Sequence, residues 1–190
     1  MTILRTVSED AAEGLVAEIY AEDIDNLGYV PSHTKVMALH PEAYRAWEHL
    51  ITAIGRPMDT RRYELVTLAA AEGIRSVHCR LAHGKKTLRY IDEPTLTEIA
   101  RDFRHAGLTD AEVAMMEFAE KVSTDSASMT DADSQRLRDH GFDDREIVDI
   151  ALAAAARNYF SRAIQALGVD VDVPAGLSEG LKQALVGRYS

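Results

Sequence analysis

Apolar residues recur at intervals of three and four along most of the chain, which is the period of amphipathic helices. One such stripe carries Tyr44, Trp47, Leu50 and Ile54, and Pro41 is well placed at the first position of that helix. No segment shows a convincing alternation of apolar and polar residues, the pattern of a half-buried strand. The pattern predicts an all-α protein built as a helical bundle.

Capping residues, glycines and prolines predict where the helices begin and end. Ser8, followed by two acidic residues, is expected to start the first helix, which would run to about Asn26. The other expected helices follow the same signals: Ser32 to His40, one from Pro41, one after Asp59, one after Ser76, Pro94 to near Gly107, one after Thr109, a small one ending at Gly141, Asp143 to Leu167, and Leu177 to Val186. A Ser/Thr-rich connection is expected from Ser123 to Thr130.

The most informative stretch runs from residue 64 to residue 83. Small and branched apolar residues fill several faces of the segment that follows Glu64, which predicts a buried helix. Gly73 interrupts this helix, and Ser76 fits as the N-cap of the next one. Cys79 then falls in the first turn, where the positive end of the helix favours a thiolate. His83 lies four residues later, on the same face and within reach of the sulfur.

Two interpretations of this stretch remain open on spacing alone. A thiol, a helix N-terminus and an imidazole are the parts of an activated cysteine. A lone cysteine on an apolar helix is also commonly a small buried residue with no chemical role.

Composition limits the possible functions. The 190 residues are 46% hydrophobic and 27% charged, which is typical of one globular domain spanning 1–190. The net charge of -10 argues against nucleic acid or an anionic membrane as a partner. A single cysteine makes no intrachain disulfide, and neither a secretory signal nor a membrane-spanning run is visible. We therefore expect a cytoplasmic protein.

A metal site is a weaker interpretation. Glu72, Ser76, Cys79 and His83 would share one face of a continuous helix, but Gly73 argues for a break there. The remaining histidines are scattered and are expected at the surface or as caps: His33, His40, His49, His105 and His140. We therefore expect neither a metal nor a cofactor.

The motif around the cysteine resembles that of a known family. Glu64 is followed after eleven residues by Ser76, then by Cys79 and His83, with His78 beside the cysteine. This arrangement is similar to the Glu/Cys-x-x-Cys/His signature of the alkyl hydroperoxidase D / carboxymuconolactone decarboxylase-like family, with serine in place of the first cysteine. The similarity extends over about residues 25 to 170 and includes 137–147 and 158–162. Residues 171–190 lie beyond it, as a C-terminal tail.

The resemblance to the peroxidase-related branch implies a thiol-dependent peroxidase. Glu64, His83 and His78 would then handle protons near Cys79, which would attack a peroxide and become a sulfenic acid. Ser76 cannot resolve a sulfenic acid, so turnover would require an external thiol or a redox partner protein. Family resemblance also implies a homo-oligomer.

Two other functions remain open. The chain could be a carboxymuconolactone decarboxylase-type or other acid–base enzyme, with Glu64 and His83 acting on a small ring substrate and Cys79 only lining the pocket. It could also be a non-catalytic oligomer that binds a ligand or senses redox state. A shared fold does not decide between these functions.

Overall fold

A computed structural model describes residues 3–187, and within that range all regular structure is helical. The α-helices are α1 (Gly14–Leu27), α2 (Ser32–Met37), α3 (Pro41–Gly55), α4 (Thr60–Gly73), α5 (Val77–Thr87), α6 (Glu93–Asp102), α7 (Asp110–Asp125), α8 (Asp131–Asp139), α9 (Asp144–Ala166) and α10 (Glu179–Val186). Short 3-10 turns cover Glu9–Ala11, Phe103–His105 and Ser126–Ser128. The predicted all-α class is confirmed. None of the described helices is both long and apolar enough to cross a membrane.

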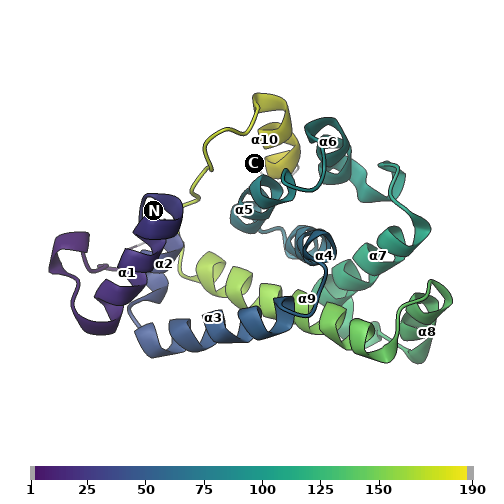
Figure 1. Ribbon diagram of the computed structural model, residues 1–190, viewed down its shortest axis with the longest axis horizontal. Coiled ribbons are helices and arrows are strands. Elements are labelled where there is room, and N and C mark those ends of the chain that lie inside the picture. Colours follow the sequence, from purple (N-terminus) through teal and green to yellow (C-terminus); the bar gives the residue numbers. More distant parts are fainter. Residues whose placement is uncertain (1–2, 188–190) are drawn as a thin grey trace.

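Helix α4 lies at the centre of the bundle, surrounded by α5, α7 and α9 (Figure 1). Every residue from Glu64 to Ala71 is buried, as the sequence predicted. Alanine and threonine are small enough for neighbouring helices to approach α4 on several sides at once. The acidic residue that begins this run is therefore held inside the protein.

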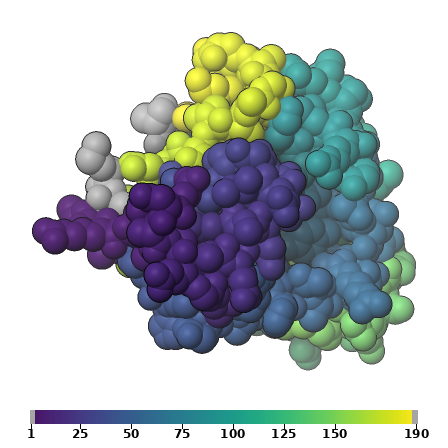
Figure 2. Space-filling model, turned by 60° about the vertical axis from the view of Figure 1, so that its left-hand side comes forward, coloured from purple at the N-terminus to yellow at the C-terminus, as the bar shows by residue number. Residues whose placement is uncertain are grey.

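The N-terminal helices α1, α2 and α3 form a second layer, in which α2 and α3 pack on α9 and α1 packs on α3 (Figure 1). Their core includes Ile19, Trp47 and Phe160, and it also contains Cys79 from α5. Viewed from the N-terminal side, α1 and the residues before it cover one face, with the C-terminal segment above them (Figure 2). The thiol thus lies where the two layers meet.

The segment after α9 returns across the bundle and ends in α10, which packs on α5 and α6. Leu181 and Leu185 are fully buried there and belong to the main core. Gly84 makes the close approach possible, because a Cβ at that position would lie 2.5 Å from Leu185 Cδ1. The C-terminal segment is therefore part of the packed structure.

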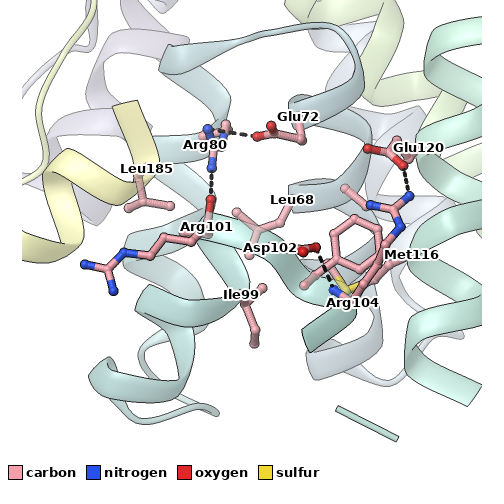
Figure 3. A pocket seen from close by; sticks show the side chains of 13 residues that line it. Leu68, Glu72, Arg80, Ile99, Arg101, Asp102, Arg104, Met116, Glu120 and Leu185 are labelled. Atoms are coloured by element: carbon pink, nitrogen blue, oxygen red, sulfur yellow. Dashed lines mark hydrogen bonds and ion pairs between the residues drawn. The ribbon is translucent and has the colours of Figure 1, made fainter. Parts of the chain in front are cut away.

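The buried side chain of Arg80 connects α5 to its neighbouring helices (Figure 3). Its side chain is 4% exposed and donates to the backbone carbonyls of Ala100 and Ala184, at 2.5 and 3.2 Å. It also pairs with Glu72 at 2.8 Å. These bonds tie α5 to α4, α6 and α10, and Glu72, Arg80 and Ala100 line a cavity of only about 80 Å³. The role of Arg80 is therefore structural, because it holds these four helices together.

Most predicted helix ends are confirmed, and four are wrong. Helix α2 ends at Met37 and not at His40, and α6 ends at Asp102 and not near Gly107. Asp59, Thr109 and Asp143 cap α4, α7 and α9 through their side chains. The first α-helix does not begin at Ser8, because Gly14 has a φ of +56° and separates an initial 3-10 turn from α1. Helix α7 also extends into the expected connection as far as Asp125, and the hydroxyl of Ser123 bonds back to the Ala119 carbonyl inside the helix.

Candidate active site

The turn between α4 and α5 places the cysteine. Gly73 lies against α7, where a Cβ would be 2.8 Å from that of Ser123, and Arg75 adopts a left-handed φ of 55°. Ser76 then caps α5, and its hydroxyl accepts from the Cys79 amide at 3.4 Å. The predicted N-cap is confirmed. Because it is used as a cap, the serine hydroxyl is directed at the backbone of the first turn.

The sulfur of Cys79 is held by two residues of α9. Its Sγ lies 3.0 Å from the Ser161 hydroxyl and 3.7 Å from Nη1 of Arg157. All three residues are buried, with exposed fractions of 5% or less. A guanidinium keeps its charge at any ordinary pH, so Arg157 places a fixed positive charge beside the sulfur. Among the described residues, the side-chain partners of the sulfur are therefore Ser161 and Arg157, and not the predicted His83.

His83 is bonded to Glu64 instead. Nδ1 of the imidazole lies 2.7 Å from Oε2 of the carboxylate, and both side chains are buried. Burial, reinforced by the charge of Arg157, lowers the pKa of His83 to about 3. Burial alone would raise the pKa of Glu64, but the bond from His83 and the charges of Lys86 and Arg157 lower it. At neutral pH a neutral imidazole therefore donates from Nδ1 to a carboxylate, which leaves the lone pair on Nε2.

A cavity of about 440 Å³ brings these groups together. Its polar lining includes Cys79, Glu64, His83, His78, His33, Lys86 and Arg157, and its aromatic lining consists of Trp47, Tyr63 and Phe160. Trp47 and Phe160 stack at a centroid distance of 4.2 Å. Of the predicted site residues, Glu64, His78, Cys79 and His83 share this cavity, while Ser76 acts on the helix backbone behind it.

His78 points to a different neighbour. Its Nε2 lies 3.0 Å from Nδ1 of His33, and the rings meet edge to face. Burial lowers the pKa of both rings, that of His33 to about 3. The prediction that His33 is a surface or capping residue is therefore wrong. It holds for His40, which caps α3, and for the exposed His49, His105 and His140.

The metal-binding face considered from the sequence does not form. The break at Gly73 separates Glu72 from α5, and Glu72 pairs with Arg80. Ser76 is used as a cap. His83 and Cys79 have the separate partners described above.

Sequence reasoning did not single out Arg157 and Ser161. They lie four residues apart on an otherwise alanine-rich helix, and this spacing puts both on one face. A charged residue and a hydroxyl on the buried face of such a helix are the signal that could have identified them.

Comparison with known proteins supports the fold. No protein-family model matches the chain, and no curated protein matches it by sequence. An uncharacterized peroxidase-related protein from Ralstonia eutropha JMP134, described as an alkylhydroperoxidase AhpD core, is 23% identical, with a TM-score of 0.76 over 97% of this chain and 99% of that chain. A peroxidase-related protein from Silicibacter sp. TM1040 is also 23% identical, with a TM-score of 0.76 over 90% and 92%.

A third similar structure is a complex of the debrominase Bmp8 with 2,3,4-tribromopyrrole. It is 16% identical, with a TM-score of 0.77 over 97% of this chain and 98% of that chain. At these identities the likeness is one of fold. The three structures bear out the architecture that the sequence resemblance implied.

Proposed function

We propose that this chain, whose fold is that of the alkylhydroperoxidase D core, is a thiol-dependent peroxidase-like enzyme in which Cys79 is the only nucleophilic thiol. The observation that carries the proposal is the placement of Sγ on a cavity wall, 3.0 Å from the Ser161 hydroxyl and 3.7 Å from the Arg157 guanidinium. A hydroxyl donor and a fixed positive charge stabilise a thiolate, which is the reactive form.

The first half-reaction needs only groups that line this cavity. The thiolate attacks one peroxide oxygen, the O–O bond breaks, and Cys79 becomes a sulfenic acid while the peroxide is reduced to an alcohol or water. The departing oxygen takes up the proton that the Cys79 thiol loses on becoming a thiolate. His83 is suited to carry that proton on Nε2, because Glu64 at 2.7 Å stabilises the transient imidazolium.

The second half-reaction requires an external reductant. Cys79 is the only cysteine of the chain, so no internal thiol can attack the sulfenic acid. One external thiol would form a mixed disulfide and release water, and a second would release Cys79 and leave as the external disulfide. A low-molecular-weight thiol or a dithiol partner protein fits this requirement.

A second candidate function is favoured by the aromatic walls. Trp47 and Phe160 stack beside the neutral His83 and the ionised Glu64, which suits acid–base chemistry on a small ring. The fold of the debrominase Bmp8 accommodates a tribromopyrrole. In this function Cys79 would line the pocket without reacting.

The test compares wild type with Cys79→Ser. We expect wild type to consume an alkyl hydroperoxide in the presence of an added dithiol, and to show a sulfenic acid by intact-mass analysis with a sulfenate trap. Cys79→Ser should do neither. Unmodified wild-type Cys79 after graded peroxide, with no turnover, would refute the peroxidase proposal and leave the ring chemistry of Glu64 and His83.

The proposal includes a homo-oligomer formed through α9. Val148, Leu152, Ala155 and Tyr159 are all exposed, and their spacing places them on one apolar stripe along this helix. Exposed apolar residues along about three consecutive turns are typical of a surface that another chain covers. A second copy of this chain is the proposed partner.

A further inference from the structure

Three segments far apart in the sequence meet beside the Cys79 cavity. His33 comes from α2, His78 from α5, and Asp172 from the segment between α9 and α10. Each offers one ligand atom, and these atoms all lie within 4.8 Å of one another. His78 is 8% exposed, and His33 and Asp172 are half-buried. The cluster is separate from the Glu64–His83 pair, although His33 and His78 also line the cavity.

One ring nitrogen of His33 and one of His78 already lie side by side. Nε2 of His78 and Nδ1 of His33 are 3.0 Å apart, so one ring donates and the other accepts. In a tetrahedral site with metal–nitrogen distances of ~2.0–2.1 Å, two ligand atoms lie about 3.4 Å apart. The rings therefore need to separate by only a few tenths of an ångström, while the shared proton moves to the outer nitrogen of its own ring.

The carboxylate of Asp172 is held in place by Ser32. The Ser32 amide donates to Oδ2 and its hydroxyl donates to Oδ1, each at 2.7 Å. Each carboxylate oxygen keeps a further lone pair for another partner. Carboxylates that bind metals are commonly oriented by such hydrogen bonds. The carboxylate oxygen lies at most 4.8 Å from the two ring nitrogens, and ligand atoms of a tetrahedral site lie about 3.4 Å apart. A movement of up to about 1.4 Å therefore brings the oxygen to the same ion as the rings.

We propose that His33, His78 and Asp172 form a binding site for a divalent first-row transition-metal ion, with Zn²⁺ as the reference ion. Two imidazoles and one carboxylate are a ligand set that such ions accept, and three protein ligands leave a coordination position for solvent or substrate. Because two of the ligands line the Cys79 cavity, the ion would lie at its wall. The proposal stands independently of the proposed peroxidase function, and it departs from the expectation of no metal drawn from the sequence.

The site could be tested by metal binding to the purified, tag-free protein. We expect equilibrium dialysis against Zn²⁺, followed by elemental analysis, to give one ion per chain. His33→Ala and Asp172→Asn should lose this ion at concentrations that saturate wild type. Ser32→Ala, which removes only a supporting hydrogen bond, should weaken binding about tenfold.

Two control variants test whether the loss of Zn²⁺ binding is specific to the proposed ligands. His140→Ala removes an imidazole that is exposed and distant in sequence from the cluster, and it should bind like wild type. Cys79→Ser should also bind like wild type, because the thiol is not among the proposed ligands. Circular dichroism would establish that each variant is folded.

X-ray absorption of the Zn²⁺-loaded wild type provides a readout that needs no variant. We expect nitrogen and oxygen ligands with the outer-shell scattering of two imidazoles and no sulfur. The proposal is overturned if wild type binds no Zn²⁺, if a sulfur ligand appears, or if folded His33→Ala and Asp172→Asn bind as tightly as wild type.

Discussion

Ser161→Ala tests which direction the hydrogen bond to Cys79 takes. The Ser161 hydroxyl lies 3.0 Å from Sγ, and either atom could donate. The guanidinium of Arg157 lies 3.7 Å from the same sulfur, and the thiolate that the proposed reaction requires can only accept a hydrogen bond. We therefore expect the hydroxyl to donate to the sulfur and to stabilise its reactive form.

The expected magnitude follows from the loss of one buried bond to a charged group. Such bonds contribute about 1.5–3 kcal/mol, and each ~1.4 kcal/mol changes a rate tenfold. Arg157 remains in the variant and retains part of the stabilisation, so the lower end of the range applies. Ser161→Ala should react with peroxide about tenfold more slowly than wild type at neutral pH.

The assay measures the rate of sulfenic acid formation by stopped-flow mixing with peroxide, and the rate of alkylation by iodoacetamide. Ser123→Ala is the matched control, because this serine is also buried and bonds to the Ala119 carbonyl and to Asn158 instead of the thiol. Its rates should stay within about twofold of wild type.

Two results would refute the reasoning. A faster reaction of Ser161→Ala would mean that the hydroxyl accepts from a thiol and holds it in the unreactive form. Equal slowing in Ser161→Ala and Ser123→Ala would mean that both act through general destabilisation of the fold.

Three further predictions follow from the same structure. Ser76→Cys should form an intramolecular disulfide with Cys79 after peroxide, seen by intact mass as the loss of two hydrogens; a persistent sulfenic acid in the variant would contradict this. Because burial lowers the pKa of His83 to about 3, the unfolded chain binds this proton first as the pH falls below about 6.5. The free energy of unfolding, from urea titrations, should therefore decrease from pH 7 to pH 4, and less steeply in His83→Gln; equal slopes would exclude His83 as the cause. Leu152→Arg should convert the oligomer to monomer in sedimentation at micromolar concentration, whereas an unchanged assembly would exclude the α9 stripe.

The local signals in the sequence were sufficient for most of the helices, and the family resemblance gave Glu64 and His83 a shared role. Helix periodicity and caps act over a few residues, so they predicted the buried α4 and the N-cap at Ser76. The Glu64–His83 bond joins neighbouring helices of the motif. These features depend on contacts between residues that are close in the sequence or share a known pattern.

The partners of the thiol could not be predicted in this way. Arg157 and Ser161 follow Cys79 by 78 and 82 residues, and no spacing rule connects them before α9 is packed against α5. The same limit applies to His33, which meets His78 only because α2 is folded onto α9 and α5. The break at Gly73 was visible in the sequence, but its consequence for Glu72 depended on the position of Arg80.

The contact between Gly84 and Leu185 has a consequence for how the protein is made. Helix α5 carries Cys79 and His83, yet its second turn is shaped to receive a side chain from α10. During synthesis the thiol leaves the ribosome long before Arg157, Ser161 and α10 do. The nascent chain therefore carries its cysteine without the groups that hold it, and the packing of α10 on α5 can form only after Leu185 has emerged from the exit tunnel.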